Sequence, residues 1–92
     1  MFWGENMIRI VYDGYNFPEF LRKIRVGLGL SQKEFSDIAL EKGLSGFSYA
    51  SIRNYEQGKA EPKYILDFID GLKWAFENEL NERDVIIIID VK

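Results

Sequence analysis

Two helix starts, 17 positions apart, constrain the fold of this chain more than any other feature of its sequence. The first, Ser31-Gln32-Lys33-Glu34, is a capping box, in which the serine hydroxyl and the glutamate carboxylate each accept a hydrogen bond from a backbone N–H. The second begins at Ser48. An apolar residue precedes each serine and another follows it by four positions, as in a hydrophobic staple. The sequence therefore predicts two neighbouring short helices, over 31–42 and 48–57, joined by a turn.

Apolar residues at helical spacing predict further helices on both sides of this pair. Asn16 is expected to cap a helix that has Pro18 in its first turn and ends near Gly27 and Gly29. After Pro62, an apolar stripe continues through residues 65–80 and predicts the last helical segment. We therefore expect a helical core of four or five helices over residues 17–80.

A segment rich in β-branched residues lies near each end of the chain, at 7–12 and 85–91. Two strands alone are marginal in water, so these two are expected to pair either within one chain or between two subunits. The second run does not alternate polar with apolar residues, which predicts cover on both faces. A strand-mediated homodimer is favoured, and the alternative is that the run completes the core of a monomer. The residues expected in this strand or dimer contact are Ile8, Ile10, Ile86, Ile87, Ile88 and Ile89.

Composition restricts the possible functions. The 92 residues include no cysteine and no histidine, which excludes a disulfide framework, a zinc finger and the commonest general base. We expect a single mainly α domain over 1–92 that is not an enzyme and binds neither cofactor nor metal. The N-terminal residues lack the pattern of a signal peptide, and the longest apolar run is far shorter than the roughly 20 residues of a membrane span. A cytoplasmic protein with no membrane partner is therefore expected.

Two motifs in the predicted helix pair resemble one known family. Residues 28–35, Leu-Gly-Leu-Ser-Gln-Lys-Glu-Phe, resemble the start of the second helix in the Cro/repressor-type, or xenobiotic-response-element, helix-turn-helix family. Residues 51–62, Ser-Ile-Arg-Asn-Tyr-Glu-Gln-Gly-Lys-Ala-Glu-Pro, resemble the recognition helix of that family and its exit. Together the matches span about residues 17–80. The resemblance implies a repressor-like, lambda-repressor-like domain that regulates transcription by binding an operator in double-stranded DNA as a homodimer.

The resemblance also assigns roles to particular residues. It implies a structural ion pair between Arg25 and Glu56, the alternative being a solvated Glu56. In this motif the third helix enters the major groove and the second lies against the DNA backbone. The expected base-reading residues are Ser48, Tyr49, Ala50, Arg53 and Asn54, and the expected phosphate contacts are Gln32, Lys33, Lys59 and Lys63. For each of them the alternative is an ordinary exposed side chain.

The interval between the two motifs departs from the family pattern. From Gln32 to Ser51 there are 19 positions, several more than in the compact pattern, and the extra residues fall around Leu40 to Phe47. The enlarged turn puts the angle between the two helices in doubt. Residues 45–48 could instead project as a flexible loop that meets the DNA backbone or a partner.

The charge of the chain is unevenly distributed. The formal net charge is −3, but residues 17–64 carry eight bases against six acids, and residues 65–92 carry three bases against seven acids. Residues 17–64, which contain both motifs of the resemblance, are thus mildly basic, because the acidic residues are concentrated in the last helix and the C-terminal residues.

A second interpretation is a helix-turn-helix domain used for protein–protein interaction, such as an antitoxin-like neutraliser. Such a protein would hold its partner with the acidic last helix and the isoleucine strand.

Overall fold

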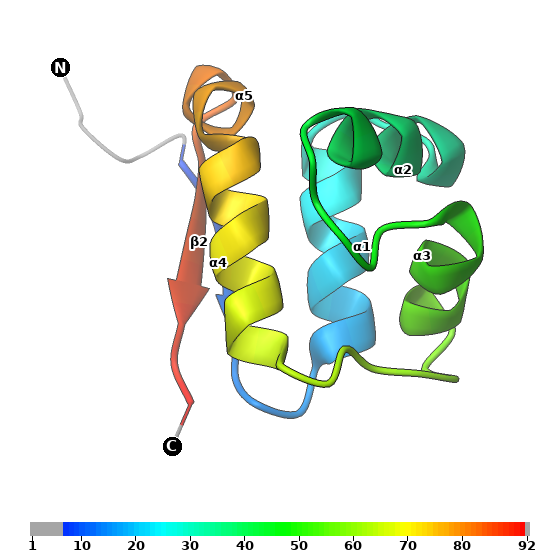
Figure 1. Ribbon diagram of the computed structural model, residues 1–92. Helices are drawn as coiled ribbons and strands as arrows, with labels where there is room; N and C mark the ends of the chain where they lie inside the picture. The colour runs from blue at the N-terminus through cyan, green and yellow to red at the C-terminus, as the bar shows by residue number, and fades with distance from the viewer. Residues whose placement is uncertain (1–6, 92) are drawn as a thin grey trace, which may run out of the picture.

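The described part of the chain forms five helices and two short parallel strands. The computed structural model describes residues 7–91, and residues 1–6 and 92, which the single-domain expectation also includes, lie outside the described residues. The order of elements is β1 (Ile8–Tyr12), α1 (Phe17–Gly27), α2 (Gln32–Glu41), α3 (Tyr49–Glu56), α4 (Ile65–Ala75), α5 (Glu77–Glu82) and β2 (Val85–Ile89). The sheet lies on one side of α1 and α4, and α2 and α3 lie on the other (Figure 1). The expectation of a mainly helical chain with a strand near each end is confirmed.

The starts of α2 and α3 are held as their sequences predict. Ser31 Oγ accepts a hydrogen bond from the N–H of Glu34 at 3.1 Å, and the Glu34 carboxylate accepts one from the N–H of Ser31 at 2.9 Å. At α3, Ser48 Oγ accepts a hydrogen bond from the N–H of Ser51 at 3.1 Å. These bonds satisfy backbone donors that the first turn of a helix leaves free.

The prediction that the Asn16 side chain caps α1 is wrong. Asn16 occupies the N-cap position, but its side chain makes no capping hydrogen bond to α1. Its oxygen instead accepts from the N–H of Asp13, and its Nδ2 donates to the carbonyl of Val11 at 2.8 Å. Asn16 therefore joins the end of β1 to the turn, while Pro18 supplies the favourable first-turn backbone of α1.

The apolar stripe over residues 65–80 is divided between two helices. The backbone of Phe76, with φ −109° and ψ 18°, lies between α4 and α5, and its side chain is buried. The N–H of Leu80 still donates to the Phe76 carbonyl at 2.8 Å, so the apolar face continues across the break. Residues 7–91 therefore contain five helices, the larger of the two predicted numbers.

The strands pair within one chain. β1 and β2 are parallel, with Ile8 beside Val85 and Tyr12 beside Ile89, and the connection between them contains all five helices. The face of the sheet that packs on the core is buried, and its residues are Ile10, Tyr12, Val85 and Ile87. On the other face Val11 is exposed and Ile86 and Ile88 are half-buried, so residues 7–91 do not provide the expected cover on both faces of β2.

Aromatic rings fill the core between the helices. Phe17, Phe20, Phe35, Phe47 and Phe76 are each at most 1% exposed, and several meet edge to face. Such pairs add to the hydrophobic gain from burying large apolar area. Within residues 7–91, no helix combines the length and the apolar character that a membrane crossing would require.

Candidate nucleic-acid interface

Helix α3 buries one face and exposes the other. Ile52 and Tyr55 point into the core, with 0% and 9% of their surface exposed. Four of the five residues expected to read bases lie on the exposed face, and the fifth, at the N-cap, is exposed as well: Ser48, Tyr49, Ala50, Arg53 and Asn54. The division follows from helical periodicity, because residues 52 and 55 share a face that 50, 53 and 54 do not.

Two of the exposed residues are already engaged within the helix. The guanidinium of Arg53 lies 5.5 Å from the centre of the Tyr49 ring, one turn earlier, which is cation–π distance. The hydroxyl of Ser48 donates to Ser51 Oγ at 2.9 Å in addition to capping the helix. Arg53 is thus partly pre-oriented on the exposed face, whereas Ser48 serves the helix start.

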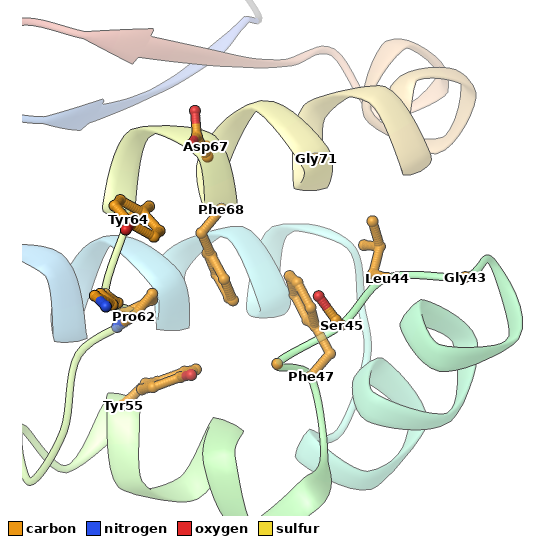
Figure 2. A pocket seen from close by; sticks show the side chains of 12 residues that line it. Gly43, Leu44, Ser45, Phe47, Tyr55, Pro62, Tyr64, Asp67, Phe68 and Gly71 are labelled. Atoms are coloured by element: carbon orange, nitrogen blue, oxygen red, sulfur yellow. The ribbon is translucent and has the colours of Figure 1, made fainter.

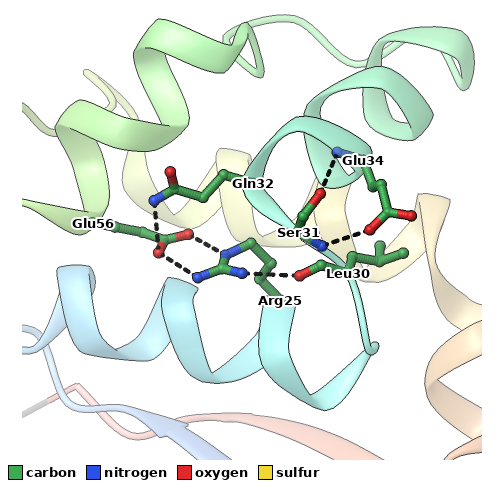
Figure 3. A network of polar contacts seen from close by, with 6 residues as sticks. All are labelled: Arg25, Leu30, Ser31, Gln32, Glu34 and Glu56. Atoms are coloured by element: carbon green, nitrogen blue, oxygen red, sulfur yellow. Dashed lines mark hydrogen bonds and ion pairs between the residues drawn. The ribbon is translucent and has the colours of Figure 1, made fainter.

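A buried ion pair fastens α3 to α1 (Figure 3). Arg25 donates through Nε to Glu56 Oε2 at 2.7 Å and through a terminal nitrogen to Glu56 Oε1 at 2.9 Å, so the pair is bidentate. The side chains of Arg25 and Glu56 are 14% and 4% exposed. The pair implied by the resemblance is therefore present. The hydrogen bond to Glu56 raises the pKa of Arg25, while burial opposes that shift.

The same carboxylate is also bound by α2. Gln32 donates from Nε2 to Glu56 Oε1 at 3.2 Å, and Arg25 donates in addition to the Leu30 carbonyl at 2.9 Å, just before α2 (Figure 3). The network therefore joins α1, the start of α2 and the end of α3. Sequence reasoning assigned Gln32 to phosphate and missed this contact. The hydrogen-bonding capacity of a glutamine beside a buried glutamate is the only signal for it, and the two residues are 24 positions apart.

The expected phosphate contacts lie around this network at the surface. Lys33 is exposed at the first turn of α2 and pairs loosely with Asp37 at 3.3 Å. Lys59 and Lys63 are exposed in the connection between α3 and α4, and the Lys63 ammonium lies 5.5 Å from the Tyr64 ring. All three ammonium groups remain accessible to an anionic partner.

Sequence reasoning also missed Arg22 of α1. It lines an open groove of about 440 Å³ together with Pro18, Glu19, Arg25, Gln32, Glu56 and Gln57. Arg22 is exposed and lies one turn before Arg25, so helical spacing could have indicated that both arginines share this face. Arg22 of α1 and Gln32 at the start of α2 therefore line the same groove.

The enlarged connection between α2 and α3 packs against α4 (Figure 2). Phe47 is 1% exposed and stacks on Phe68 with ring centres 4.3 Å apart and planes at 5°. The suggestion that residues 45–48 project as a free loop is wrong for Phe47, which anchors the segment. Beside this stack is an open cavity of about 430 Å³, and its lining residues include Tyr55, Tyr64 and Asp67.

Comparison with known proteins finds no matching family model, no similar curated protein and no similar solved structure. The function of the exposed face of α3 must therefore be inferred from its residues and from how the other helices hold it.

Proposed function

We propose that this protein is a sequence-specific DNA-binding regulator of the helix-turn-helix type, acting on an operator as a dimer. The observation that carries the proposal is the fixed position of α3. Its inner side is held by the Arg25–Glu56–Gln32 network, and its exposed side carries hydrogen-bonding side chains. A recognition helix needs both properties, because base readout depends on a rigid orientation in the major groove.

The chemistry of the exposed face suits base edges and phosphates in separate places. Arg53 suits the O6 and N7 acceptors of guanine, and Asn54 suits the N6 donor and N7 acceptor of adenine. Lys33 in the first turn of α2, and Lys59 and Lys63 in the connection after α3, are exposed and suit phosphates, with Gln32 at the start of α2. Arg22 extends this basic border along α1. These contacts would fix the register of α3 on the duplex, while Arg53 and Asn54 would select the sequence.

The alternative function is a protein-interaction module. It is favoured by the acidic C-terminal segment of the chain, residues 65–92, and by Trp74 of α4, whose side chain is among the most exposed large apolar groups. That surface lies on α4 and the sheet rather than on α3. The two functions therefore predict that different surfaces are needed, and variants on each surface separate them.

A titration of the full chain against labelled duplex DNA tests the proposal. We expect binding to random duplex at low salt that weakens steeply as salt is added, because phosphate contacts release counterions. After an operator is selected from a random library, Arg53→Ala and Asn54→Ala should each weaken it by about 5- to 100-fold and relax selectivity at one base pair. Lys23→Ala, an exposed lysine of α1 paired with Glu19, is the matched control and should bind as the wild type.

Two results would overturn the proposal. One is the absence of any DNA binding at low salt. The other is wild-type affinity and selectivity in both α3 variants with their fold intact, which would remove α3 as the reading helix. Circular dichroism on each variant establishes that the helices are retained.

A further inference from the structure

Within residues 7–91, the outer edge of β2 carries backbone groups for which no hydrogen-bond partner is found. The N–H of Ile8 donates to the Asp84 carbonyl at 2.7 Å, and the N–H of Asp90 donates to the Tyr12 carbonyl at 2.9 Å. Alternate residues of a parallel strand bond on one side, so Ile86 and Ile88 also face β1. The N–H and C=O groups of Val85, Ile87 and Ile89 therefore point to the opposite edge.

The three residues of this edge differ in exposure. Val85 is 3% exposed, Ile87 is 8% exposed and Ile89 is 37% exposed, and no hydrogen bond from their outward-facing backbone groups is found within residues 7–91. A buried backbone donor or acceptor without a partner costs free energy comparable to a lost hydrogen bond. Such an edge is a template for another strand.

A groove opens beside this edge. It measures about 440 Å³ and lies between the outward side of α4 and α5 and the first residues of β2. Trp74 of α4, 72% exposed, stands at the groove, and Lys73 and Glu77 line it as well. Addition of a strand would bury the indole and complete the hydrogen bonding of β2 in one step, as in β-augmentation.

The other edge of the sheet is protected. β1 carries the charged residue Arg9, and Asn16 Nδ2 already donates to the carbonyl of Val11 on β1. Charged residues and side chains that satisfy an edge are common ways to prevent strand addition. β2 carries five aliphatic residues and no charge. Strand addition is therefore directed to β2.

We propose that β2 pairs antiparallel with β2 of a second copy, which joins the two sheets into one of four strands. Two identical open edges satisfy each other around a two-fold axis, and the protected β1 edges then lie outermost and end the assembly at two chains. Lys73 and Glu77 have opposite charges and form no ion pair with each other in the described chain. In the two-fold dimer, Lys73 and Glu77 of the second copy come to this groove in the opposite order, so each charge can face the opposite charge of the other copy.

The arrangement of layers suits this dimer to the proposed function, on which the choice of a second copy partly rests. The helices cover one face of the sheet, with α3 on the side away from it (Figure 1). A two-fold axis perpendicular to the joined sheet keeps both α3 helices on the same side of the dimer. Dimeric helix-turn-helix proteins need this arrangement to reach two half-sites of one duplex.

The solution mass and amide exchange of the full chain test the inference without DNA. Light scattering across a concentration series should give about twice the monomer mass of 10.8 kDa at high concentration. In that dimer, the amide protons of Val85, Ile87 and Ile89 should exchange at least tenfold more slowly than on dilution. A monomer at every concentration, or a dimer in which these amides stay unprotected, overturns the inference.

Two neighbouring proline substitutions provide a matched pair. Ile89→Pro removes an N–H that faces the open edge and should yield a folded monomer, since proline is tolerated where the N–H is not used in the ladder. Asp90→Pro removes the N–H bonded to Tyr12 and should lower the melting temperature while leaving the dimer intact. Removal of residues 85–92 would be a poorer test, because Val85 and Ile87 belong to the core.

Failure of this inference is distinguishable from failure of the DNA-binding proposal. A dimer that binds no DNA at low salt overturns only the proposed function. A monomer that binds DNA through α3 overturns only the β2 interface. Protection of the β2 amides only after an extended peptide from another protein is added shows that the edge binds a different partner and also overturns the second copy as its occupant.

Discussion

The carboxylate of Glu56 lies almost wholly out of water and receives donors from Arg25 and Gln32. Removal of Arg25 would leave this buried charge without its counter-ion. We expect Arg25→Ala to lower the free energy of unfolding by about 3 kcal/mol, and the double variant Arg25→Met, Glu56→Met to recover part of that loss. Lys33→Ala, which breaks an exposed pair, should cost less than about 0.5 kcal/mol. Urea unfolding of the four proteins measures these differences, and equal costs for Arg25→Ala and Lys33→Ala would contradict a structural role for the pair.

Glu34 links the stability of α2 to pH. Hydrogen bonds from Ser31, first from its backbone N–H and then at its side chain, lower the pKa of Glu34. A carboxyl whose pKa is lowered on folding contributes stability above its unfolded pKa, about 4.3, and loses it as the pH falls through the folded value. We expect Glu34→Gln to lose less stability than the wild type between about pH 6 and about pH 3. The pKa of Glu79 is also lowered, by its hydrogen bond with Lys42, so some acid sensitivity should remain.

Urea midpoints measured at several pH values test this dependence. The control is Glu41→Gln, an exposed carboxyl near the end of the same helix that forms no capping box. It should follow the wild type through the acid range. If Glu34→Gln follows it as well, the capping box does not contribute to acid sensitivity.

At the scale of elements, the connection between α2 and α3 depends on Phe47. Its ring meets Phe68 of α4 and Phe35 of α2, and it immediately precedes the cap of α3. We expect Phe47→Ala to cost about 3 kcal/mol, in the range of large-to-small substitutions in well-packed cores. Amide exchange in α3 should rise more than in β1. Ser45→Ala, exposed in the same connection, should change neither quantity, and an equal effect of the two substitutions would show that Phe47 does not anchor the segment.

Elements set by local chemistry could be predicted from the sequence. The starts of α2 and α3 depend on residues three and four positions apart, so the serine and glutamate patterns located them. The break at Phe76 could not be predicted, because the apolar stripe runs through it and neither proline nor glycine lies within four residues of it. Whether β1 and β2 pair within one chain depends on contacts across more than 70 residues, which local patterns do not contain.

The candidate site divides in the same way. Helical periodicity was sufficient to separate Ile52 and Tyr55 from the exposed residues of α3. The Arg25–Glu56 pair was expected only through a family resemblance, since its members are 31 positions apart. The contact of Gln32 with Glu56 and the place of Arg22 in the groove depend on how three helices pack, and no single segment of sequence encodes them.

At the scale of the whole molecule, charge separates the two ends of the structure. The basic side chains around α3 lie in the segment with eight bases and six acids, whereas α4, α5 and β2 belong to the segment with seven acids and three bases. A net charge of −3 gives little general attraction to DNA, so affinity has to come from local contacts. The acidic side chains of α4 and α5 would also disfavour binding of the duplex to the opposite face of the protein.

The salt dependence of operator binding reports both the contacts and the number of chains. In the proposed complex, Lys33, Lys59 and Lys63 of each of two chains would contact phosphates, and these six contacts alone would give a slope of log affinity against log salt concentration of about −5. Lys59→Ala removes one contact per chain, so a dimer should lose about 2 from that slope and a monomer about 1. Lys23→Ala should leave the slope unchanged. Fluorescence anisotropy at five or more salt concentrations provides the measurement. A slope that Lys59→Ala does not alter would place the phosphate contacts on another face, and a change of about 1 would show that one chain binds alone.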